Sequence, residues 1–153
     1  MATKKGKGIF ATSKTELILG LIIAVLVIVP IIGYTVYINK VEPKVETKGD
    51  NVQISAFLSN TIEFSAQEIE SVDLVNFLPA GTRVNGLGTR GHLRGNYKYE
   101  GYGKTKVFIY RKYPPYVLIK LKDKPSVFIN SQSQETTHKI YASLLALYAE
   151  TEA

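Results

Sequence analysis

The spacing of hydrophobic and polar positions changes along the chain, and each spacing predicts a different element. Residues 17–38 form an apolar run without one charged side chain. At about 1.5 Å of rise per residue, a helix of this length can cross a hydrocarbon core about 30 Å thick. We therefore interpret residues 17–38 as a transmembrane helix. Ser13 and Glu16 fit the S-x-x-E pattern of a capping box, which predicts that the helix begins near them.

A cleavable signal peptide is the alternative interpretation of the same run. The run is longer than the apolar region of about 7 to 15 residues in such peptides, and no A-x-A-like site follows it. A retained anchor then divides the chain into a basic tail at 1–16, the helix at 17–38, a linker at 39–50 and a domain at 51–150. The linker alternates charges and contains Pro43, which is typical of a solvated spacer.

From Asn51 the pattern changes to period two, which predicts strands with one buried face. Residues 51–58 and 61–65 are predicted to form a hairpin. Six further strands are predicted at about 71–77, 82–85, 93–99, 105–111, 116–122 and 126–130, and we expect about seven of the eight candidates to form. In the strand 93–99, the alternation predicts that Tyr97 and Tyr99 face the core, and that Arg94 and Lys98 face water.

The last part of the chain switches to a helical period and predicts one amphipathic helix at about 134–149. Its apolar stripe consists of Ile140, Tyr141, Leu144, Leu145 and Tyr148. About seven antiparallel strands followed by one helix predict a mainly β fold, a small bent barrel with the helix closing an open end.

Charge is distributed unevenly over a formal net charge of +6. Residues 51–82 carry four acidic and no basic side chains, whereas residues 83–124 carry eleven basic side chains and two acidic ones. Such a basic region suits phosphate, lipid headgroups or an acidic partner, although a solvated strand face with loops gives the same count. The absence of cysteine excludes disulfides, thiolate metal sites and a cysteine nucleophile.

The motifs associated with catalysis do not stand in the context that their chemistry needs. Residues 86–91 fit G-x-G-x-x-G, but a strand at 93–99 follows them where a dinucleotide site needs a helix. Residues 103–105 resemble the end of a P-loop without its first glycine. His92, expected to be an exposed loop residue, and His138 lack a spaced third metal ligand. We therefore expect no enzyme activity, no cofactor and no metal.

One group of cations is a candidate binding surface. If the loop before Leu93 folds beside the turn after Tyr99, the cations and nearby tyrosines form a basic, aromatic-edged surface that suits phosphate or nucleic acid. Dispersed solubilising charge is the alternative interpretation. The candidate residues are Arg83, Arg90, Arg94, Lys98, Lys104 and Lys106.

The order of several short motifs extends across the domain. They are Leu78-Pro79, Arg83 with Asn85-Gly86, Gly95 with Tyr97, Gly101-Tyr102-Gly103, Pro114-Pro115, Ile129-Asn130, and Thr137 with Tyr141. On these motifs, residues 72–145 resemble the bacterial membrane-associated pleckstrin-homology (PH-like) domain family. The resemblance implies a PH-like barrel and a non-enzymatic binding or scaffolding role at a bacterial membrane. The phosphoinositide site of eukaryotic PH domains has no residue-by-residue match.

The leading hypothesis is a single-pass membrane protein whose PH-like domain serves protein interaction or assembly, with an unidentified protein partner. The alternative is direct binding of anionic ligands such as lipid headgroups or cell-wall polymers. Four lysines precede the apolar run and three follow it before Asp50. This bias favours a cytoplasmic amino terminus and an extracytoplasmic domain. No nucleic acid partner is expected, and a homo-oligomer is left open.

Overall fold

The computed structural model describes residues 13–56 and 60–151, which divide into two units between Lys40 and Val41. The described part of the first unit is a single helix, α1 (Lys14–Lys40), with Pro30 inside it. The predicted capping box is present. The Ser13 amide donates to the Glu16 carboxylate over 2.8 Å, and the Glu16 amide donates to Ser13 Oγ over 3.2 Å.

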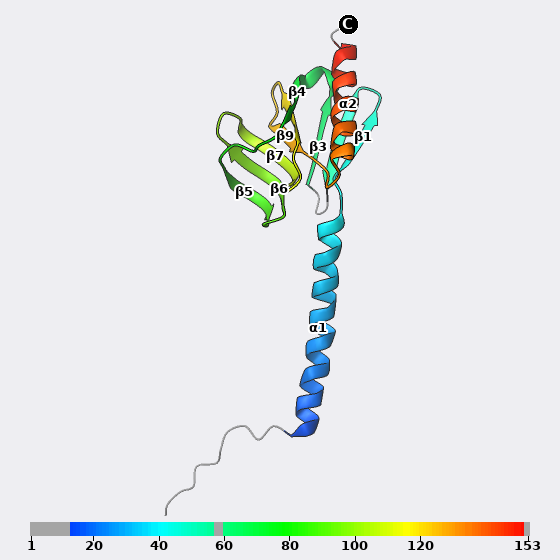
Figure 1. Cartoon of the computed structure of the whole chain (residues 1–153), viewed down its shortest axis with the longest axis vertical. Coiled ribbons are helices and arrows are strands. Elements are labelled where there is room, and N and C mark those ends of the chain that lie inside the picture. The colour runs from blue at the N-terminus through cyan, green and yellow to red at the C-terminus, as the bar shows by residue number, and fades with distance from the viewer. Residues whose placement is uncertain (1–12, 57–59, 152–153) are drawn as a thin grey trace, which may run out of the picture. The chain divides into compact units, whose positions relative to one another are not determined.

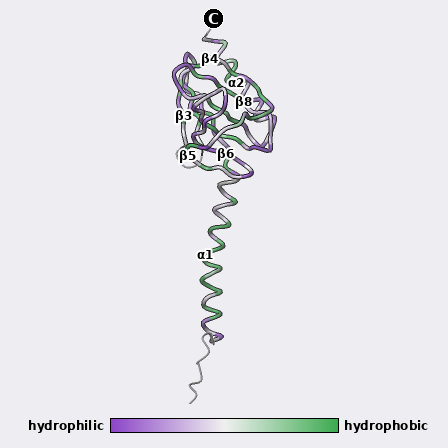
Figure 2. Tube along the Cα trace, turned by 90° about the vertical axis from the view of Figure 1, so that its left-hand side faces the viewer, coloured by the Kyte–Doolittle hydropathy of each residue, from purple (hydrophilic) through white to green (hydrophobic). Residues whose placement is uncertain are grey.

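Helix α1 is long and apolar enough over residues 14–37 to cross a membrane. Between Leu17 and Val36 its leucine, isoleucine and valine side chains are exposed on all sides, and hydrophobic residues run along the helix in Figure 2. A helix that is hydrophobic all round is typical either of a protein core or of a membrane span. Since no described residue of its own unit covers these side chains, they suit a lipid environment.

The second unit begins with a three-stranded antiparallel sheet in the order β1-β2-β3. Its strands are β1 (Lys44–Lys48), β2 (Asn51–Ala56) and β3 (Asn60–Ser65). The predicted hairpin is confirmed by the pairing of β2 with β3, and the predicted strand residue Leu58 lies outside the described residues. Val52, Ile54 and Phe64 are buried on one face of the sheet.

Strand β1 corrects one prediction, because it lies inside the segment 39–50 that we expected to be a solvated spacer. It pairs with β2 along its whole length, from Lys44 opposite Ser55 to Lys48 opposite Asn51. With Val45 as its one apolar residue, β1 has no alternation for a periodicity argument to detect. Backbone hydrogen bonds to β2 hold this strand in the sheet.

A six-stranded sheet follows in the order β4-β8-β9-β7-β6-β5. Its strands are β4 (Ile69–Val75), β5 (Gly81–Gly88), β6 (His92–Tyr99), β7 (Gly103–Tyr110), β8 (Tyr116–Leu121) and β9 (Ser126–Ile129). The expectation of about seven antiparallel strands was wrong in two respects. The described residues of this unit contain nine strands, and β7 and β9 run parallel. Figure 1 shows β5, β6 and β7 as one continuous layer.

Strands β7, β8 and β9 of the six-stranded sheet are apolar on both faces, as the sequence predicted for 105–111. In β8, Val117 and Ile119 join one core with the three-stranded sheet, whereas Tyr116 and Leu118 join a second core on the opposite face. This second core is rich in aromatic rings from β6 and β9, such as Tyr99 against Phe128. The two cores follow directly from the period of two along each strand.

Helix α2 (Gln134–Thr151) closes the fold against the first core, where Leu144 is buried. It contacts β4, β8 and the 3₁₀ turn Ala66–Glu68. The predicted stripe is correct except at one position, because Leu145 is exposed and Leu147 packs in its place. The mainly β fold with one carboxy-terminal helix is confirmed.

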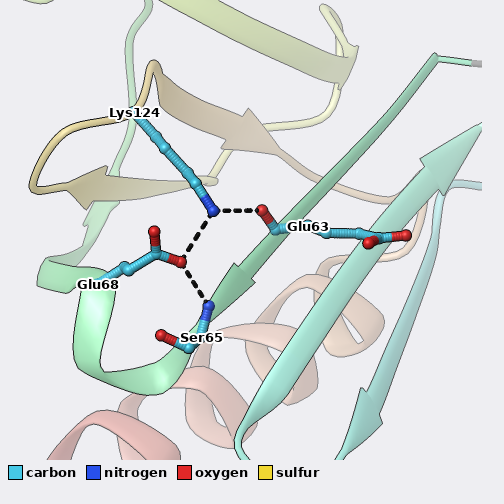
Figure 3. Close-up of polar contacts among 4 residues, drawn as sticks. All are labelled: Glu63, Ser65, Glu68 and Lys124. Carbon is cyan, nitrogen blue, oxygen red and sulfur yellow. Dashed lines mark hydrogen bonds and ion pairs between the residues drawn. The ribbon is translucent and has the colours of Figure 1, made fainter.

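The outer edge of β3 is closed by side chains from elsewhere in the domain, and we call it the closed edge. Lys106 donates to the Thr61 carbonyl oxygen over 2.6 Å, and Lys124 donates to the Glu63 carbonyl oxygen over 2.9 Å. Figure 3 shows that Lys124 also pairs with the Glu68 carboxylate at 2.9 Å, while that carboxylate accepts the Ser65 amide. Backbone groups that would otherwise stay open to another strand are therefore satisfied.

Candidate functional site

An open cleft of about 750 Å³ lies beside the second core. We call it the cationic cleft, because three guanidinium groups line it together with glycine, apolar and tyrosine side chains. None of its lining residues is acidic, within the part of the chain that the structure describes. The lining residues are Leu78, Pro79, Ala80, Gly81, Arg83, Gly88, Thr89, Arg90, Leu93, Tyr97, Tyr99 and Arg111.

Two features of the β5–β6 hairpin position the cleft. Gly86 and Gly95 lie opposite each other with φ of 109° and 128°, and a Cβ on Gly95 would stand 2.4 Å from the Asn85 carbonyl oxygen. The register also shifts between Arg83 and Asn85, which leaves Val84 as the extra residue of a bulge. A bulge of this kind bends a strand and redirects its side chains.

Arg83 lies over the end of its own strand. A Cβ on Gly88 would stand 2.8 Å from the Tyr97 hydroxyl oxygen and 3.4 Å from the Arg83 guanidinium, so this glycine leaves room for both groups. Arg83 is also paired in register with Tyr97. The guanidinium and the phenol of these two residues therefore face the same cleft.

Arg111 enters the cleft from the end of β7. Its amide donates to the Gly91 carbonyl oxygen over 2.8 Å, and its own carbonyl oxygen accepts the Tyr116 hydroxyl over 2.6 Å. These bonds fix the residue beside the β5–β6 turn, which also carries Arg90. The sequence reasoning missed Arg111, although its position directly after a strand that is apolar on both faces was a usable signal.

The tyrosines of the cleft are uncharged hydrogen-bond donors at neutral pH. Burial raises the pKa of Tyr97, against the opposing influence of Arg83 and Arg111. Burial, with the neighbouring Tyr97, raises the pKa of Tyr99 to about 12. The two rings stack with centroids 6.0 Å apart, and the Tyr97 hydroxyl donates to the Leu87 carbonyl oxygen over 3.2 Å. The charge of the cleft therefore comes from its three arginines.

The six cations proposed from sequence do not form one surface. Arg83 and Arg90 line the cleft, whereas Lys98 and Lys104 are exposed and pair in register outside it. Lys106 is only partly exposed and belongs to the closed edge of β3, where burial lowers the pKa of its ammonium group. The register explains why these lysines lie apart from the cleft. Lys98 pairs with Lys104 and Asn96 with Lys106, on the face of the sheet opposite to that of Tyr97, which pairs with Arg83.

Arg94 corrects a prediction, because it was expected to face water and is 4% exposed. Its guanidinium donates to the Val41 carbonyl oxygen and, over 3.1 Å, to the Tyr110 hydroxyl, which itself donates to the same carbonyl over 2.8 Å. His92 was expected in an exposed loop but is buried in β6, and burial lowers its pKa. Arg94 therefore fixes the first residue of the domain and does not serve the cleft.

Residues 44–139 match the family model described as the bacterial PH domain. The chain belongs to the bacterial PH domain family. The match covers more than half of the chain and includes β1. Searches of curated proteins and of solved structures returned no match. The resemblance inferred from sequence motifs is thus confirmed, and the fold is that of a PH-like domain.

Several of the motifs that carry the family resemblance serve the fold. The Asn130 side chain accepts the Tyr110 amide over 2.7 Å and donates to the Tyr113 carbonyl oxygen over 2.6 Å. Thr137 is fully buried, and its hydroxyl accepts the Ser131 amide over 3.0 Å. These bonds tie the end of β9 to β7 and to the start of α2. These two motifs therefore contribute to the fold and do not line the cleft.

The cleft is suited to hold an anion. Each arginine offers a planar set of donors that matches carboxylate or phosphate oxygens, and the tyrosine rings provide apolar walls. The described residues contain no group of three or more His, Cys, Asp or Glu side chains that could hold a metal ion. The charged side chains that line the cleft, among the described residues, are its three guanidinium groups.

Proposed function

We propose that this protein is a membrane-anchored PH domain that acts as a non-enzymatic binding module, and that the cationic cleft is its binding site. The observation that supports the proposal is the convergence of Arg83, Arg90 and Arg111 on one cleft without a carboxylate. Arginines that converge repel one another, and an anion between them relieves that repulsion.

In this proposal α1 is the anchor. Its length and apolar surface suit a single membrane span, and the lysine bias favours a cytoplasmic amino terminus. Because the chain contains no cysteine, one cysteine introduced at exposed Lys104 gives a unique label. Labelling of intact cells by a membrane-impermeant maleimide is expected, and labelling only after lysis would reverse the proposed orientation.

Two classes of ligand can bring an anion to this cleft. A protein partner presents carboxylates, whereas a lipid or a wall polymer presents phosphates or carboxylates without a polypeptide. Both need the same arginines. The first test therefore concerns the cleft itself, with a small inorganic anion as the probe.

Inorganic tripolyphosphate is titrated into the full chain in nanodiscs of neutral phosphatidylcholine, with calorimetry as the readout. Replacement of Arg83, Arg90 and Arg111 by glutamine is expected to weaken binding at least tenfold. Replacement of exposed Lys98, Lys104 and Lys122 by glutamine removes the same charge outside the cleft and is expected to change affinity by less than threefold. Equal losses in the two triple variants would contradict a localised site.

A further inference from the structure

The four outer edges of the two sheets are not equivalent. The edge of β3 is the closed edge, β4 contacts α2, and β1 is short with three charged residues among five. Strand β5 is an edge strand of eight residues that pairs, among the described strands, with β6 alone. Charge, shortness, bulges and covering are the usual ways in which proteins prevent strand addition. Strand β5 is long, and its one charged residue is Arg83, which donates to the Gly86 carbonyl oxygen over 3.5 Å beside the bulge at Val84.

The surface of β5 is accessible along its length. Every residue of the strand except Leu87 is exposed, no proline interrupts it, and Val84 at the bulge is 65% exposed. Three glycines keep side chains away from much of the backbone. We call this strand border the open edge. It leaves room for another extended chain to approach the backbone of β5.

The open edge borders the cationic cleft. Arg83 and Gly88 belong to β5 and line the cleft, and Arg90 follows two residues after the strand ends. In a strand added to β5, alternate side chains point to the face that carries Arg83. These alternate side chains are spaced about 6.6 Å apart, so acidic residues at every second position would all lie on the face that carries Arg83.

We propose that the occupant is an extended acidic segment of a partner protein, which adds to β5 as a further strand and places alternate carboxylates in the cationic cleft. This inference rests on the proposed function and names the class of ligand. Charge complementarity selects an acidic segment, because three arginines and no carboxylate line the cleft. The open edge selects a polypeptide, because a lipid headgroup or a glycan strand has no extended amide backbone with which to pair.

The experiment uses a capped, fluorescent ten-residue peptide of alternating Glu and Thr, titrated into the full chain in phosphatidylcholine nanodiscs. Two further peptides carry N-methyl groups on one or the other set of alternate residues. N-methylation removes a donor and blocks one edge of a strand without changing charge. One methylated peptide is expected to bind at least tenfold more weakly than the parent, and the other within threefold of it. A Gln-Thr peptide is expected to lose binding at least tenfold.

Variants of the chain distinguish peptide binding in the cleft from general attraction to positive charge. Arg111→Gln is expected to weaken binding of the Glu-Thr peptide at least tenfold. Lys104→Gln is expected to change the affinity for this peptide by less than threefold. Both residues are exposed, so neither change removes a core side chain. Circular dichroism of the two variants checks that the fold is retained.

Equal binding of both methylated peptides would overturn strand addition, while dependence on Arg111 would still support anion binding by the cleft. Failure of all peptides, with tripolyphosphate still bound, would overturn the further inference and leave the proposed function standing. Binding only to vesicles that contain phosphatidylglycerol would identify a lipid as the occupant and would also overturn it. So would a dimer of the chain that the Glu-Thr peptide does not dissociate, because a second copy would then occupy the edge.

Discussion

The outer edges of β3 and β5 belong to the same domain but differ in how far other side chains cover their backbone. At β3, the ammonium groups of Lys106 and Lys124 donate hydrogen bonds to backbone carbonyl oxygens, and the Glu68 carboxylate accepts one from the Ser65 amide. At β5, the backbone border is exposed and lies beside three arginines. The difference shows that basic residues of this PH domain stand in two settings. Some donate to the backbone at an edge of a sheet, and others line a cleft beside an exposed edge, where we propose that a partner binds.

The largest expected effect on the free energy of unfolding comes from a change where β5 lies close to β6. Gly95→Ala places a Cβ 2.4 Å from the Asn85 carbonyl oxygen at a φ of 128°, so either the strand pair separates or the backbone strains. We expect a loss of about 3 kcal/mol in the free energy of unfolding. Tyrosine fluorescence during denaturant unfolding in micelles measures it, since the chain has ten tyrosines and no tryptophan.

Gly101→Ala is the matched control for Gly95→Ala. Gly101 also has a positive φ, of 80°, but a Cβ there meets no atom within 4 Å. Strain without a clash is expected to cost about 1 kcal/mol. If the two variants lose the same stability, the close approach of β5 to β6 does not explain the position of the open edge.

The closed edge gives the next effect. Lys106→Met keeps an apolar stem but removes the donor to the Thr61 carbonyl oxygen, which leaves a partly buried acceptor unsatisfied. We expect a loss of about 1–2 kcal/mol in stability and no change in anion binding. Lys104→Met, on the exposed neighbour, is expected to change stability by less than about 0.5 kcal/mol. Loss of anion binding in Lys106→Met would show that the two settings are not separate.

The smallest effect is a pH dependence at the closed edge. The hydrogen bond from Lys124, followed by that from the Ser65 amide, lowers the pKa of Glu68 from its ordinary value of 4.5. A lowered folded-state pKa contributes stability above the unfolded-state pKa, and this contribution disappears as the pH falls through the folded-state pKa. Unfolding midpoints between pH 7 and pH 3 are expected to fall less steeply in Glu68→Gln. If the unfolding midpoints of the two proteins fall in parallel with pH, Glu68 does not contribute to this pH dependence.

Periodicity predicted most of the fold because its signal is local. The alternation of β2 and β3 and the stripe on α2 each bury one face, so the sequence pattern records the burial. Strand β1 was not predicted, because Val45 is its one apolar residue and its position depends on backbone pairing with β2. The parallel pairing of β7 with β9 was not predicted, because alternation contains no information on strand direction.

The site was only half predicted, for a different reason. Arg83 and Arg90 were found by charge, but charge alone does not tell which face of a strand a cation occupies. Arg94 satisfies the Val41 carbonyl oxygen, which lies 53 residues away in the chain. Arg111 joins the cleft through a bond to Gly91 that spans the β6–β7 hairpin. Contacts at this separation in sequence depend on the folded sheet and leave no periodic pattern.

Hydrogen exchange of the full chain in phosphatidylcholine nanodiscs, with and without the Glu-Thr peptide, tests the central claim most directly. Amides of the open edge in β5 are predicted to exchange quickly in the free protein and at least tenfold more slowly with the peptide bound. The Ser65 amide, which already donates to Glu68, is predicted to exchange at the same rate in both states. Unchanged exchange in β5 at a saturating peptide concentration, or slowing confined to other strands, would contradict the account.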